Sequence, residues 1–207
     1  MTVRDEKADI RELIESWVVW RDMGEWERLR KIWHSDGRMA ASWREGTADE
    51  FIEANRQGWD RGLDILHHLG GSVVMLSETG DRALTLTKMV ISQRAEIHGT
   101  LCEVAAQARH FDRWEKREGR WGLVDRKTIF DRDRLDTVDP NATVQLDQSV
   151  LSRFPVAYRH LAYLQVSLGY PVRDDLPHLR SEAADALFGA GAEWLTSQPT
   201  SSGTGTG

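Results

Sequence analysis

A small set of side chains in this sequence could move protons. Asp22 directly follows a helical stripe of apolar residues, and His68 comes shortly before a β-branched run. Histidine has the ordinary pKa closest to neutrality, so it can accept a proton at pH 7. A carboxylate bonded to its other ring nitrogen would hold one tautomer and stabilise the imidazolium. Taken singly, Asp22 could equally be a surface carboxylate that ends a helix, and His68 a turn histidine bonded to the backbone.

His110 is a second candidate for proton chemistry. It shares one face of an alternating segment with Ala106 and Ala108, whose small side chains suit the wall of a cavity. It could protonate a leaving hydroxyl, or it could be a histidine whose hydrogen bonds are satisfied within a sheet. The pattern leaves both interpretations open.

Other chemistries lack their usual signatures. The sequence contains no phosphate-binding loop, no zinc-type spacing of Cys and His, and no serine nucleophile elbow. None of the seven histidines occurs in an HxxxH or HxH pattern, and the adjacent His67 and His68 would point opposite ways in an extended chain. We therefore expect neither a metal nor an organic cofactor.

Composition narrows the class of protein further. The 207 residues carry a net charge of −6, and basic residues between Arg109 and Arg134 are interleaved with acids, so nucleic acid is not an expected partner. No apolar run is long enough to cross a membrane. A single cysteine, Cys102, and a charged N-terminus without an apolar stretch indicate a soluble cytoplasmic protein.

The first third of the chain is predicted to be mostly helical. Apolar residues recur at helical spacing over 5–21 and again over 26–33, with a break at Met23-Gly24. Residues 38–43 suggest a short strand, and the acids at 49–50 suggest the start of a helix that runs to about residue 62.

The middle of the chain reads as strands. Segments 72–77, 82–93, 101–114 and 121–131 are β-branched, apolar or alternating, and turn-type residues separate most of them. Helices followed by such a meander predict an α+β fold, with a curved antiparallel sheet wrapped onto three N-terminal helices.

The last third reads as an appendage. Residues 132–146 are polar and suggest a linker, and helical patterns follow near 158–165 and 183–195. The Ser-, Thr- and Gly-rich end suggests disorder. The expected division is a domain at 1–138, a helical extension at 139–196 and a tail at 197–207.

A family resemblance supports this assembly. The segment from Ile10 through Asp22 to Asp36 resembles the start of the SnoaL-like branch of the nuclear transport factor 2-like (NTF2-like) superfamily, in particular its hexachlorocyclohexane dehydrochlorinase and scytalone dehydratase lyases. That family folds as a cone, with three helices and a curved sheet around a ligand cavity. The resemblance implies an Asp at the place of Asp22, a His at the place of His68, and an Arg at the place of Arg126, after the Gly119-Arg-Trp121 hairpin.

The resemblance also implies roles. His68 would be the general base, Asp22 would orient it, and Arg126 would neutralise charge on a leaving group. Two departures are clear: Trp17 stands where the dehydrochlorinase has a lysine that receives chloride, and Arg21 where scytalone dehydratase has a tyrosine. The expected reaction is a cofactor-independent elimination of water, halide or formaldehyde.

The expected ligand is small and hydrophobic, and aromatic in the favoured interpretation. Nine tryptophans are available, most of them core residues and some pocket walls. The candidate walls are Trp17, Trp20, Met39, Trp43, Met89 and Trp114. Two alternatives stay open, a non-catalytic binding protein and a ketosteroid isomerase-like enzyme, although the first 135 residues hold no tyrosine for an oxyanion. The resemblance further implies a homo-oligomer, with a trimer favoured over a dimer.

Overall fold

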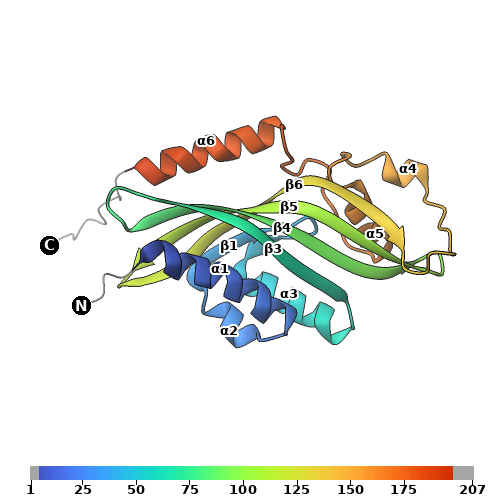
Figure 1. Cartoon of the computed structure of the whole chain (residues 1–207), viewed down its shortest axis with the longest axis horizontal. Helices are drawn as coiled ribbons and strands as arrows, with labels where there is room; N and C mark the ends of the chain where they lie inside the picture. The colour runs from blue at the N-terminus through green and yellow to red at the C-terminus, as the bar shows by residue number, and fades with distance from the viewer. Residues whose placement is uncertain (1–4, 198–207) are drawn as a thin grey trace, which may run out of the picture.

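The computed structural model describes residues 5–197 as one curved sheet with helices on both sides (Figure 1). The sheet order is β2-β1-β6-β5-β4-β3. Neighbouring strands are antiparallel, except that β1 runs parallel to β6. The α+β class expected from the sequence is confirmed. The strands are β1 (Trp33–Ala40), β2 (Glu45–Thr47), β3 (Asp64–Leu76), β4 (Arg82–Ile97), β5 (Thr100–Arg117) and β6 (Arg120–Thr137).

Three helices, α1 (Glu6–Asp22), α2 (Trp26–Arg30) and α3 (Ala48–Asp60), lie on one face of this sheet (Figure 1). The side chain of Asp5 caps α1, and Thr47 and Glu50 form a reciprocal capping box at the start of α3. These caps set where α1 and α3 begin. The length of α1 then carries Asp22 to its C-terminal end, beside β3.

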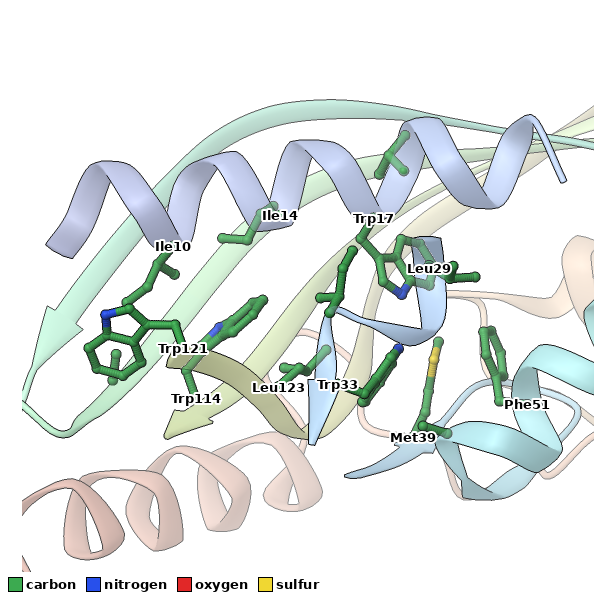
Figure 2. Packing of buried hydrophobic residues seen from close by; sticks show 14 of the residues in the cluster. Ile10, Ile14, Trp17, Leu29, Trp33, Met39, Phe51, Trp114, Trp121 and Leu123 are labelled. Atoms are coloured by element: carbon green, nitrogen blue, oxygen red, sulfur yellow. The ribbon is translucent and has the colours of Figure 1, made fainter. Parts of the chain in front are cut away.

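The core between α1 and the sheet is rich in tryptophan (Figure 2). Trp17, Trp33 and Trp114 are among the largest side chains that are almost completely buried. Figure 2 shows Trp17 of α1, Met39 of β1 and Phe51 of α3 in the same part of this core. Tryptophan burial of this extent removes a large apolar area from water, so α1 is held firmly against the sheet.

The C-terminal extension packs on both sides of the sheet. It contains α4 (Gln148–Leu151), α5 (Arg159–Ser167) and α6 (Glu182–Thr196). Helix α6 covers the face opposite α1 (Figure 1), and Gly191 permits this approach, because a Cβ there would lie 2.4 Å from the Phe111 ring. Helices α5 and α6 match the two predicted helices, whereas α4 was not anticipated. Most of the tail for which disorder was expected, residues 198–207, lies outside the described residues.

Three boundaries inferred from the sequence were wrong. Strand β1 begins at Trp33, where a helix was expected. Strand β3 begins at Asp64, because Gly70-Gly71 forms a bulge within a strand instead of a break before one. Strand β6 continues to Thr137, into the first part of the expected linker, because residues 132–137 pair with residues 102–107 of β5.

Candidate active site

An internal cavity lies between α1, α3, the inner face of the sheet and α5. The space between its lining residues, including the part that is open to solvent, is about 460 Å³. The walls come from α1 and α3, from the five strands β1, β3, β4, β5 and β6, from the segment after β1 and from the C-terminal extension. The lining residues are Trp17, Arg21, Met39, Ala41, Ser42, Trp43, Phe51, Asn55, Ile65, His67, Ile91, Gln93, His110, Thr128, Phe130 and Gln165.

An Asp–His pair lies in the wall of this cavity. One carboxylate oxygen of Asp22 is 2.8 Å from Nδ1 of His67, and the other accepts the backbone N–H of His67 at 2.6 Å. Arg21 also donates to Asp22, at 3.1 Å, and is itself tied to Asn55 and to the Ile65 carbonyl. Two bonds from one carboxylate to one histidine hold the ring in place. With Asp22 ionised, Nδ1 carries the proton and Nε2 keeps a free lone pair.

The expected partner of Asp22, His68, is therefore corrected to His67. Successive side chains of a strand point to opposite faces, and His67 and His68 both lie within β3. His67 faces the cavity, whereas His68 is exposed and lies beside Lys88 and Arg109 in a separate open hollow. The correction follows from the earlier start of β3, which makes both histidines strand residues.

The charges around the pair favour an ionised acid and a neutral base. Burial opposes ionisation of Asp22, but the hydrogen bond and charge of His67, together with Arg21, hold its pKa below the ordinary value. Burial lowers the pKa of His67; Arg21 and Arg126 lower it further, and Asp22 opposes them. A neutral imidazole with a lone pair toward a ligand is the form that a general base requires.

His110 lies in the same cavity and is buried. Its ring meets Trp17 edge-on, with 5.3 Å between the ring centroids. Burial, with added repulsion from Arg126 and His67, lowers the pKa of His110 well below its ordinary value. A histidine in this state is neutral at pH 7, so the structure favours a hydrogen-bonding role over that of a cationic acid.

Arg126 does not line the cavity. Its guanidinium forms a bidentate ion pair with Asp112, with both N–O distances at 2.7 Å, and stacks over Trp17 at 4.3 Å from the ring centroid. Arg126 and Asp112 are fully buried, and Nη1 of Arg126 has no hydrogen-bond partner among the described residues. The expected contact of Arg126 with a leaving group is therefore corrected: its guanidinium is paired with Asp112 and stacked on Trp17, outside the cavity lining.

The candidate wall residues divide into two groups. Trp17, Met39 and Trp43 line the cavity. Trp20, Met89 and Trp114 do not line it. Trp20 packs against the core between α1 and the sheet, and Met89 belongs to the core that contains α5. Trp114 is buried and donates a hydrogen bond to the Thr85 hydroxyl at 3.0 Å. Large buried side chains are common in both settings, so residue type alone could not separate them.

Several lining residues were missed from the sequence. The most notable are the amides: Asn55 on α3, Gln93 on β4 and Gln165 on α5. The sequence pattern of β4 could have identified Gln93 as a lining residue, because a polar residue on the inward face of an apolar strand is unusual. Gln165 could not have been assigned, because it reaches the cavity only through the packing of the extension.

The described residues contain neither a metal-type cluster of side chains nor a membrane-type helix. Within residues 5–197, no group of three or more His, Cys, Asp or Glu side chains is arranged to hold a metal ion. Across the same residues, none of the helices combines the length and apolar character needed to span a membrane.

The chain belongs to the family of proteins with a SnoaL-like domain, whose model matches residues 2–127. Among curated relatives, it is 34% identical over 199 residues to pea pathogenicity protein 2 of Fusarium vanettenii, covering 92% of this chain and 85% of that protein. An uncharacterised protein of Aspergillus terreus is 35% identical, over 86% of this chain and 72% of its own length. Coverage of this extent includes most of the C-terminal extension.

Solved structures share the fold. A hexachlorocyclohexane dehydrochlorinase from Novosphingobium barchaimii superposes with a TM-score of 0.53 at 16% identity, covering 67% of this chain and 94% of its own. A candidate scytalone dehydratase from Novosphingobium aromaticivorans gives a TM-score of 0.51 at 15% identity, covering 68% and 95%. At this identity the similarity establishes the NTF2-like fold, and the chemistry must be argued from the site.

Proposed function

We propose that this protein is a cofactor-independent lyase in which Asp22 and His67 remove a proton from a small aromatic substrate. The observation that carries the proposal is the pair of hydrogen bonds between Asp22 and His67 in the wall of the cavity. These bonds leave Nε2 of His67 as the atom that accepts the proton. The similarity in fold to a dehydrochlorinase supports this class of reaction.

The proposed step balances without a further reactant. In a dehydration, a C–H bond breaks as its proton moves to Nε2 of His67. The electron pair forms a carbon–carbon double bond, and the bond to the neighbouring hydroxyl breaks. The imidazolium then returns the proton to the leaving hydroxide as water, which restores the neutral base. With halide as the leaving group the same C–H bond breaks, and halide departs with the electron pair of its own bond to carbon. With formaldehyde, His67 instead takes the proton of a terminal CH2OH group, the C–C bond to that group breaks as C=O forms, and the imidazolium returns the proton to the carbon left with the electron pair.

His110 and Arg126 have supporting roles in this proposal. Neutral His110 can donate a hydrogen bond to an oxygen of the substrate, because its ring lies in the wall of the cavity. The charge of Arg126 stabilises negative charge that develops in the cavity, although the residue lies behind Trp17. The protein thus supplies electrostatic stabilisation from fixed groups instead of from mobile solvent.

The walls favour an aromatic substrate. Trp43 and Phe51 stack with 6.0 Å between ring centroids, and Trp17 and Phe51 with 6.3 Å. Flat apolar surfaces of this kind pack well against a ring. The buried amides Asn55, Gln93 and Gln165 add polar positions at the border of the apolar region.

A substrate screen tests the proposal. Purified protein is incubated with aryl-propane diols, hydroxylated aromatics and chlorinated cyclohexanes, and products are sought by mass spectrometry. We expect a product lighter by water, hydrogen chloride or formaldehyde, and a loss of roughly 10²-fold or more in His67→Ala and Asp22→Asn. His68→Ala is the matched control, because His68 is adjacent in sequence but faces away from the cavity.

Three results would contradict the proposal. Turnover that survives both His67→Ala and Asp22→Asn would remove the pair from the mechanism. Loss of turnover in His68→Ala with retention in His67→Ala would reverse the assignment of the base. Tight binding of one compound without any product would favour the second candidate, a non-catalytic binding protein, for which the sealed Arg126–Asp112 pair is the supporting observation.

A further inference from the structure

A second hollow, beside the C-terminal extension, shares part of its lining with the cavity. The space within this outer hollow, including the part that is open to solvent, is about 430 Å³, and Trp26, Trp59 and Tyr170 lie at its border. Tyr170 stabilises the border, since it lies 5.3 Å from Trp43 and accepts a hydrogen bond from Arg61 at 2.8 Å. The residues that line both spaces are Arg21, Trp43, Asn55, Ile65, Gln93 and Gln165.

Most polar side chains at this shared border already have partners. Arg21 donates to Asp22, to Asn55 and to a backbone carbonyl. Asn55 accepts that bond and donates to the Phe51 carbonyl at 2.8 Å. Gln165 accepts from the Ser42 hydroxyl at 2.7 Å. These bonds leave little capacity in Arg21 and Asn55 for a ligand.

Gln93 is different. It is only 2% exposed, and its Oε1 has no hydrogen-bond partner among the described residues. A buried acceptor without a partner is costly, so native proteins usually satisfy such an atom with protein, water or ligand. A donor from a bound molecule would complete this site.

The strand register gives the distance between Gln93 and the base. His67 lies opposite Ile91 of β4, and Gln93 lies opposite Ile65, two residues further along both strands. Two residues of an extended strand span about 7 Å. A ligand with its reacting carbon at His67 would therefore present its far end to Gln93.

We propose that Gln93, with Gln165 beside it, forms a recognition subsite for a hydroxyl group at the end of the ligand remote from His67. The ligand is accordingly a hydroxyphenyl compound, whose ring lies between the aromatic walls. Its hydroxyl donates to Gln93 and can accept from the amide of Gln165, which the extension contributes. This inference rests on the proposed function only for the position of the reacting carbon.

Binding of two matched compounds tests the subsite. The probes are 3-phenyl-1-propanol and 3-(4-hydroxyphenyl)-1-propanol, which differ by one phenolic hydroxyl. Quenching of tryptophan fluorescence in the full-length protein reports binding, because Trp17 and Trp43 line the cavity. The wild type should bind the phenol roughly five- to tenfold more tightly, as expected for one hydrogen bond that completes a buried group.

Variants separate the subsite from general damage to the fold. Gln93→Leu should lose the preference for the phenol yet bind 3-phenyl-1-propanol at least as well, because the unpaired buried acceptor is gone. Gln107→Leu is the control, since Gln107 is an exposed glutamine on the neighbouring strand β5. Gln165→Leu should lose part of the preference.

Three outcomes would overturn the subsite. In the first, the wild type binds both compounds with equal affinity. In the second it binds neither, and in the third the preference for the phenol survives in Gln93→Leu. His67→Ala distinguishes this outcome from failure of the proposed function. If His67→Ala keeps both turnover and the phenol preference, the base is wrong and the subsite stands. If His67→Ala loses turnover while no phenol preference exists in the wild type, the base stands and the subsite is wrong.

Discussion

Two Asp–His pairs in this molecule have almost the same geometry and different surroundings. In the first, Asp22 accepts the backbone N–H of His67 at 2.6 Å and faces its Nδ1 at 2.8 Å. In the second, Asp133 of β6 accepts the backbone N–H of His160 at 2.7 Å and faces its Nδ1 at 2.8 Å. An orienting carboxylate is therefore not sufficient to define a base.

The surroundings make the distinction. His67 lines a cavity that also contains His110, and its pKa is lowered by burial and nearby cations. Asp133 has a completely buried side chain and also accepts the backbone N–H of Leu161 at 2.8 Å. Asp133 thus binds the free backbone donors at the start of α5, as a helix cap does. One pair faces the cavity, and the other attaches the extension to the sheet.

Removal of each histidine should give the largest contrast. His67→Ala or Asp22→Asn should lower kcat/KM by about 10²- to 10⁴-fold, the usual contribution of a positioned general base. His160→Ala should leave kcat/KM within about twofold of wild type when it is measured at a temperature where the variant is folded. The measurement is steady-state kinetics on the substrate found by the screen, and a comparable loss in His160→Ala would remove the functional distinction.

Removal of each aspartate should give the opposite ranking for stability: the loss at Asp133 should exceed the loss at Asp22. Asp133→Ala breaks three hydrogen bonds and leaves two backbone donors of α5 without partners, so we expect a loss of about 2 kcal/mol in the free energy of unfolding. Asp22→Asn keeps the shape and an acceptor for the His67 backbone, so its loss should stay below about 1 kcal/mol. Urea unfolding followed by circular dichroism measures both, and equal losses would mean that Asp22 is as structural as Asp133.

The two pairs also show what the sequence could predict. The helical stripe that ends at Asp22 was visible from apolar spacing, and the α+β class followed from the order of elements. Between His67 and His68, however, the choice depends on strand register, and a one-residue error exchanges the two faces. The sequence suggested a strand boundary at Gly70-Gly71, but the structure has a bulge there, inside β3. Because of this error, both histidines were predicted to lie before the strand instead of within it.

The second pair was hidden for a related reason. Asp133 points inward from a stretch of β6 whose polar side chains resemble a linker, and its partner His160 lies 27 residues later. The contacts of Gln165 with Ser42 span 123 residues. No local pattern encodes such pairs, because they depend on how the extension packs against the completed sheet.

The pH dependence of activity should sharpen the assignment of the base. The active form has neutral His67, and its pKa is lowered from 6.5 by burial and by Arg21 and Arg126. As pH falls, kcat/KM should therefore remain high below pH 6.5 and decline only at more acidic values. Asp22→Asn removes a group that raises this pKa, so the decline should move to still lower pH. A midpoint above 6.5 in a kcat/KM profile would contradict a base with this environment.

The pH dependence of stability gives the smallest expected effect, and His110→Gln tests the part of it that comes from the cavity histidines. Burial lowers the pKa of both His67 and His110 in the folded protein. Between those values and the unfolded value of about 6.5, the unfolded chain binds more protons than the native one, so stability falls as pH falls through this window. His110→Gln removes one of the two groups and should make the decline in Tm between pH 7.5 and pH 5.5 shallower. A steeper slope in His110→Gln would show that His110 is not held neutral by its surroundings.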